Sequence, residues 1–161
     1  MIQSIVIRAV CLLIIMAACA ACAAPLPERP TLCQLATARQ NYVGRELTVD
    51  GYLLLSFHGN DIVDPTCRGA GVSISWDWDR PQLRPFISFA RQIGTIEPWV
   101  VRVRATGVLV RDEGTGENAP RFSLRLDTAE VLDAWKVPEA EEERFDMWIQ
   151  GSGPAPTRPN R

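Results

Sequence analysis

In residues 44–57, GRELTVDGYLLLSF, apolar positions alternate with mostly more polar ones. The odd-numbered set from 47 onward is Leu47, Val49, Gly51, Leu53, Leu55 and Phe57, and the even-numbered set is Thr48, Asp50, Tyr52, Leu54 and Ser56. Successive side chains of a strand point to opposite faces, so this period of two predicts one long strand with a single buried face.

A second stretch, residues 99–110 (WVVRVRATGVLV), shows the same alternation. Each stretch carries a glycine in its middle, Gly51 in the first and Gly107 in the second. Glycines within strands often mark a bulge or a bend at the corner of a barrel. We therefore expect the two stretches to lie together in a small closed barrel.

The other elements follow from local patterns. Thr31 and Gln34 fit a capping box that opens a helix ending near Arg39. Residues 85–93 place apolar side chains at helical spacing after a proline, which predicts an amphipathic helix. Further strands are expected to begin at Ile62 and to run through Gly71–Trp76 and Arg121–Leu132.

The first 30 residues predict export. Residues 1–18 hold one charge, Arg8, followed by an apolar run too short for a membrane span, which is typical of a signal peptide. The run ends in Met16-Ala17-Ala18-Cys19, which resembles the bacterial lipobox, in which the cysteine is diacylated and becomes the new N-terminus. Cys22 is the alternative acceptor.

By this resemblance, Ala20 after the acylated cysteine implies the periplasmic face of the outer membrane; the alternative is a soluble periplasmic or secreted protein. Residues 23–30 (AAPLPERP) are proline-rich and predict that residues 19–30 form an extended tether.

Cys33 and Cys67 are the cysteines of the folded region, and in an exported protein they predict a disulfide bond. Closing a loop of about 35 residues is worth roughly 3–4 kcal/mol in the chain-entropy treatment. Two free thiols or two metal ligands are the alternatives, although the spacing lacks the Cys-x-x-Cys pattern of common zinc sites.

The predicted order is helix, three strands, helix, two strands. A five-stranded barrel with a helix between the third and fourth strands is the OB-fold arrangement. Residues 43–52 (VGRELTVDGY) resemble the run V-G-[KR]-x-[VL]-x-V-x-G-[YVT] of small OB-fold domains of exported bacterial lipoproteins, and residues 101–109 resemble a later run of that group. We therefore expect an all-β fold class, β-rich with two short helices, in which residues 31–137 form an OB-fold-like barrel domain with an extra N-terminal helix.

Beyond the barrel domain the composition changes. Residues 138–150 form an acidic segment in which Phe145, Trp148 and Ile149 lie at helical spacing. Such a short amphipathic helix could pack back on the barrel. Residues 151–161 are rich in Gly, Pro, Ser and Thr and predict a disordered tail.

The charge balance disfavours nucleic acid as a partner. The whole chain holds 17 basic and 19 acidic residues, and only Arg8 lies within the first 20, so removal of that segment leaves 16 against 19, a net charge of −3. A net negative domain is a poor default partner for polyanions.

Two surfaces are candidates for function. A candidate binding face consists of Tyr52, Arg102, Arg104 and Arg125, with His58 and Trp78 at its edge. The structural alternative for the arginines is a cross-strand ion pair between Asp50 and Arg102 or Arg104. The structural alternative for the tryptophans places Trp76 in the core and Trp78 over a barrel end. His58, Asp61 and Asp64 could hold a metal for a hydrolase, or they could simply stabilise a turn.

The sequence shows no catalytic motif and calls for no cofactor. Because OB-folds serve many roles, the resemblance says little of function. We expect a non-catalytic, membrane-anchored binding or scaffold module whose partner is an envelope protein or a small ligand. An oligonucleotide or oligosaccharide binder and the metal-assisted hydrolase are the alternatives.

Overall fold

The computed structural model describes residues 26–56, 59–68, 70–94, 97–112 and 121–159. The predicted signal peptide, the two lipidation candidates Cys19 and Cys22, and His58 lie outside the described residues.

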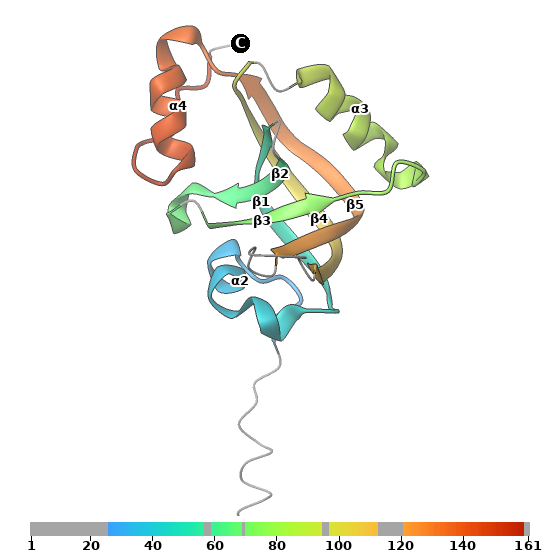
Figure 1. Ribbon diagram of the computed structural model, residues 1–161. Coiled ribbons are helices and arrows are strands. Elements are labelled where there is room, and N and C mark those ends of the chain that lie inside the picture. Colours follow the sequence, from blue (N-terminus) through green and yellow to red (C-terminus); the bar gives the residue numbers. More distant parts are fainter. Residues whose placement is uncertain (1–25, 57–58, 69, 95–96, 113–120, 160–161) are drawn as a thin grey trace, which may run out of the picture.

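Five strands close into a barrel in the order β1-β2-β3-β5-β4 (Figure 1). The strands are β1 (Glu46–Ser56), β2 (Gly59–Asp64), β3 (Ala70–Ser75), β4 (Trp99–Asp112) and β5 (Arg121–Lys136). Neighbouring strands are antiparallel except β3 and β5, whose short parallel pairing completes the ring. The last two strands extend beyond the predicted limits because they pair along their whole length, from Trp99 opposite Lys136 to Asp112 opposite Arg121.

The alternation in β1 and β4 is confirmed as a division between the barrel interior and its outside. The inward residues Leu47 and Val49 of β1 and Val103 and Leu109 of β4 are each at most 1% exposed. Burial of such side chains is worth roughly 1.5–3 kcal/mol apiece, so these two strands supply much of the core.

Gly107 is required by close approach of the backbone. The β4–β5 register shifts between Thr106 and Gly107, at the position where the sequence predicted a bulge or a bend. A Cβ at Gly107 would lie against the carbonyl oxygen of Arg125 and 2.8 Å from its carbonyl carbon. Any side chain there would push the two strands apart.

Helix α2 (Leu32–Ala38) begins with the predicted capping box. Thr31 Oγ1 accepts a hydrogen bond from Gln34 N–H, and Gln34 Oε1 accepts one from Thr31 N–H. The helix buries Leu32 and Leu35 in the core at one end of the barrel. The predicted Cys33–Cys67 disulfide is present and joins α2 to the 3₁₀ turn η2 (Pro65–Cys67) after β2.

Helix α3 (Arg84–Ile93) lies between β3 and β4 in the chain, as predicted, and buries Phe86, Ile87 and Ala90. It ends at Gly94, whose φ of 67° favours glycine.

A third helix, α4 (Glu142–Ile149), lies in residues 138–150, where the sequence predicted a short amphipathic helix, and it adds to the two helices of the predicted fold class. It packs on the outside of the barrel, far from α2 (Figure 1). Phe145 and Trp148 bury against Val100 and Val137, with Tyr52, Trp135 and Ile149 beside them. We call these seven residues the outer cluster.

The segment after α4 is held against the body, contrary to the predicted disordered tail. Thr157 N–H donates to Glu141 Oε2 at 2.5 Å, and Arg158 forms two hydrogen bonds with Asp133, at 2.9 and 3.0 Å. The Arg158 guanidinium also lies 5.4 Å from the centre of the Trp135 ring. Composition favoured disorder, but these specific contacts fix the segment across β5 and the start of α4.

The longest described helix, α3, has 10 residues, and none in the described part of the chain is long and apolar enough to cross a bilayer.

Candidate functional site

Two members of the predicted binding face, Tyr52 and Arg104, contact other parts of the same chain. Tyr52 is half-buried, and its ring meets Trp148 of α4 edge to face with centroids 4.7 Å apart. Such aromatic pairs contribute about 0.5–1.5 kcal/mol beyond the area they bury. Tyr52 therefore helps to hold α4 against the barrel.

Arg104 is engaged by Asp50 on the neighbouring strand. The two residues are opposite in register, and the guanidinium donates two hydrogen bonds to the carboxylate at 2.8 and 2.9 Å. This hydrogen bonding holds the pKa of Asp50 below its ordinary value and raises the pKa of Arg104. The cross-strand ion pair expected as the structural alternative is thus confirmed. Arg102 is exposed and lies opposite Tyr52.

The remaining members of the predicted face lie on other strands. Arg125 is exposed on β5, in register with Ser75 of β3. Trp78 is 55% exposed, packs edge to face on Trp76, and has the Arg91 guanidinium 4.7 Å from its ring centre. Trp76 packs against the core, as the structural alternative expected.

The described acids of the predicted metal loop have local partners. Asp61 accepts a hydrogen bond from Ser73 Oγ at 2.7 Å. Asp64 caps η2 by accepting from the N–H and hydroxyl of Thr66, at 2.9 and 2.7 Å. The sulfurs of Cys33 and Cys67 lie beside Asp64, but their bond to each other leaves no thiolate for a metal.

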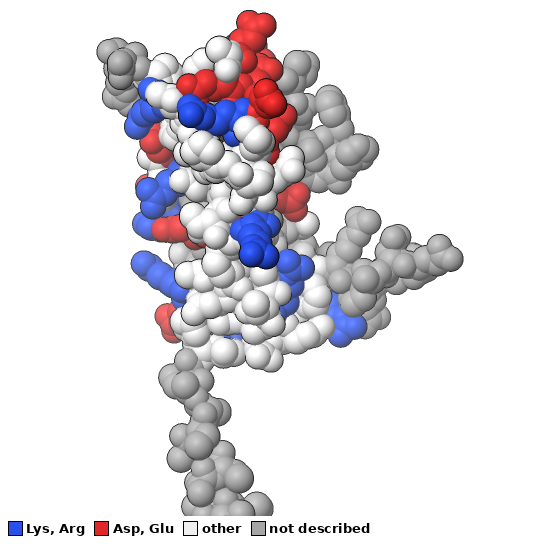
Figure 2. Space-filling model, turned by 90° about the vertical axis from the view of Figure 1, so that its left-hand side faces the viewer, with Lys and Arg blue, Asp and Glu red and all other residues white. Residues whose placement is uncertain are grey.

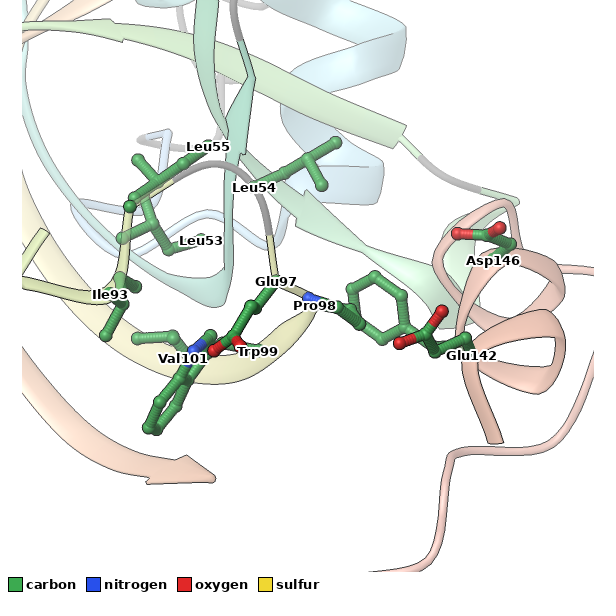
Figure 3. Close-up of a pocket in the computed structure, with 12 residues that line it drawn as sticks. Leu53, Leu54, Leu55, Ile93, Glu97, Pro98, Trp99, Val101, Glu142 and Asp146 are labelled. Carbon is green, nitrogen blue, oxygen red and sulfur yellow. The ribbon is translucent and has the colours of Figure 1, made fainter. Parts of the chain in front are cut away.

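A cleft of about 260 Å³ opens between one end of the barrel and α4. Its walls come from the end of β1, the end of α3, the start of β4 and the first turns of α4. The apolar lining consists of Leu53, Leu54, Leu55, Ile93, Pro98, Trp99, Val101 and Phe145. In Figure 3, Leu53, Leu55 and Ile93 gather on one side, and Leu54 points toward α4.

Acidic side chains form the rim of this cleft. Glu97, Glu142 and Asp146 line it, and the last two project from α4 (Figure 3). Lys136 pairs with Glu97 at 2.7 Å, whereas no cation among the described residues pairs with Glu142 or Asp146. Acidic side chains gather more widely over the α4 end of the molecule (Figure 2). The cleft therefore combines apolar lining side chains with two carboxylates that pair with no cation of the described chain.

Sequence reasoning missed this cleft, although one signal was available. Leu53, Leu54 and Leu55 interrupt the alternation with three consecutive leucines. Leu54 falls on the outward face and is only half-buried. An apolar residue in this phase indicates a contact outside the barrel.

Comparison with known proteins gives little guidance. No family model matches the chain, and no curated protein resembles it significantly. Among solved structures, an OBody, AM3L09, bound to hen egg-white lysozyme matches at 14% identity with a TM-score of 0.40, over 58% of this chain and 86% of that one.

Proposed function

We propose that this protein is an exported, membrane-anchored binding module without catalytic activity, built on an OB-type barrel, and that its binding site is the cleft beside α4. The barrel assignment is supported by the strand order and by the parallel closure of β3 on β5, with α3 between the third and fourth strands. The observation that carries the binding function is the cleft lined by apolar side chains and by the acidic residues Glu97, Glu142 and Asp146.

The anchor rests on the lipobox-like sequence before Cys19 and on the disulfide, which fits an oxidising compartment. The tether would hold the barrel on the periplasmic face of the outer membrane. Intact-mass measurement of the mature protein tests the anchor: we expect a diacylated Cys19. An unmodified chain that starts near Ala24 would show that the protein is secreted without lipid.

The binding function is tested by crosslinking in intact cells. A photo-crosslinking amino acid in place of Leu54 lies in the cleft, and the same amino acid in place of Val43, which is 37% exposed and lies outside the residues that line the cleft, is the matched control. We expect a discrete adduct from position 54 and none from position 43. Equal adducts, or none from position 54, would place the function elsewhere.

A further inference from the structure

The cleft coincides with the point where β1 and β4 stop pairing. The register runs from Glu46 opposite Val108 to Tyr52 opposite Arg102 and ends there. If the register continued, Leu55 would lie opposite Trp99. Both residues belong to strands, yet no such pair forms. The two strands separate beyond Tyr52, and the cleft occupies the space between them.

The direction of the backbone groups along β1 follows from Thr48. Its N–H donates to the carbonyl of Glu28, not to β4, while its hydroxyl lies 2.9 Å from that of Thr106. Close side chains are typical of a non-hydrogen-bonded antiparallel pair. The amides of the odd-numbered residues of β1 therefore face β4, and those of the even-numbered residues face β2.

Leu55 consequently directs its N–H and C=O into the cleft. Its even-numbered neighbour Leu54 faces Asp61 on β2 and is paired there. No described strand supplies a partner for the β4-facing side of Leu55. A strand edge of this kind is a template for an added strand.

The size and lining of the cleft restrict what it can hold. A volume of about 260 Å³ lies below the roughly 300–1,000 Å³ of pockets for drug-sized ligands. It suits one or two side chains of a peptide. In an added strand, alternate side chains would point inward, toward Leu53, Leu55 and Val101, and outward, toward α4.

We propose, on the basis of the proposed function, that the cleft takes an extended segment of a partner protein in which apolar and basic residues alternate. The segment pairs with β1 at Leu55 and places its apolar side chains in the cleft. Its Lys or Arg stems run along Leu54 and Phe145 and bring their charges to Glu142 and Asp146.

Short fluorescent peptides test this on the purified mature protein. An alternating Leu-Lys peptide is compared with an alternating Leu-Glu peptide, with a Leu-Lys peptide of scrambled order, and with a Leu-Lys peptide N-methylated on one edge. We expect each of the three to bind at least about tenfold more weakly than the alternating Leu-Lys peptide, through lost charge complementarity, lost alternation and lost backbone hydrogen bonds respectively. N-methylation alters only the peptide, so protein folding does not confuse the result.

Charge reversal in the protein supplies the second arm. Glu142→Lys with Asp146→Lys should reverse the preference between the Leu-Lys and Leu-Glu peptides. Glu139→Lys with Glu143→Lys makes the same change in net charge on exposed residues that do not line the cleft, and should leave the preference unchanged.

Three results would overturn the proposal: equal binding of the N-methylated peptide, equal effects of the two charge reversals, or no binding of Leu-Lys peptides while the protein self-associates in sedimentation. If the peptides fail but crosslinking at Leu54 still yields a discrete adduct, the binding function stands and its ligand belongs to another class. If both fail, the cleft is not the site.

Discussion

Removing the Cys33–Cys67 disulfide should lower the free energy of unfolding by an amount set by the loop that it closes. The cysteines are 34 residues apart. In the chain-entropy relation, a loop of that length gives about 3.8 kcal/mol at 25 °C. Leu32 and Leu35, at 1% and 2% exposure, keep α2 on the barrel when the bond is absent, so the folded state should persist in the variant.

The assay is urea unfolding of the wild type and of Cys33→Ser with Cys67→Ser. With a urea m-value of about 2 kcal/mol/M, the midpoint should fall by about 2 M. Wild-type protein unfolded with reductant present is the control and should match the double variant. A midpoint change below about 0.5 M with an unchanged m-value, corresponding to about 1 kcal/mol, would refute the reasoning that the bond acts mainly on the unfolded chain.

Three further predictions concern the barrel and its cover. Gly107→Ala should cost about 3 kcal/mol or more because the added Cβ meets the backbone of β5. Gly94→Ala should cost less, about 1–3 kcal/mol, because its added Cβ meets no neighbouring atom and only the backbone conformation of φ 67° and ψ −163° is strained. Chemical denaturation of the two variants compares these costs. Asp50→Asn should lower the free energy of unfolding by at most about 0.5–1 kcal/mol at pH 7, because the Asp50 side chain is 41% exposed. The difference in unfolding free energy between wild type and variant should vanish as pH falls through the lowered folded-state pKa of Asp50. Denaturation at pH 7 and pH 2 measures that difference, and the same value at both pH values would contradict the prediction. Arg158→Ala should speed proteolysis within α4 and leave the barrel amides protected; unchanged cleavage would show that the C-terminal segment does not hold the helix.

The barrel was largely predictable because its signals are local. The alternation in residues 44–57 and 99–110 indicated which side chains enter the core, and Gly107 indicated a bulge or a bend. The Cys33–Cys67 pair followed from the predicted compartment and the lack of a metal-binding spacing. Taking the two strands to be neighbours predicted that Asp50 pairs with Arg102 or Arg104, and the observed register selects Arg104.

The outer face could not be predicted from these signals. The spacing of Phe145 and Trp148 indicated a helix that could pack back on the barrel, but spacing does not say which strands the helix contacts. Only the docked position explains why Val100, on the outward phase of β4, is 1% exposed and why Tyr52 is covered. The cleft depends on where the β1–β4 pairing ends, and tertiary packing decides that position. In the sequence, Leu54 indicated a contact outside the barrel because it is an apolar residue on the outward face.

Amide hydrogen exchange of Leu54 and Leu55, measured by NMR on the protein without added peptide, tests the central claim most directly. The account predicts that Leu54, paired with β2, exchanges slowly, as Val49 does in the closed part of the ladder, while Leu55 exchanges far faster. Equal and strong protection of Leu54 and Leu55 would mean that the edge of β1 is already paired within the chain. The cleft would then present no unpaired strand edge with which a partner segment could pair.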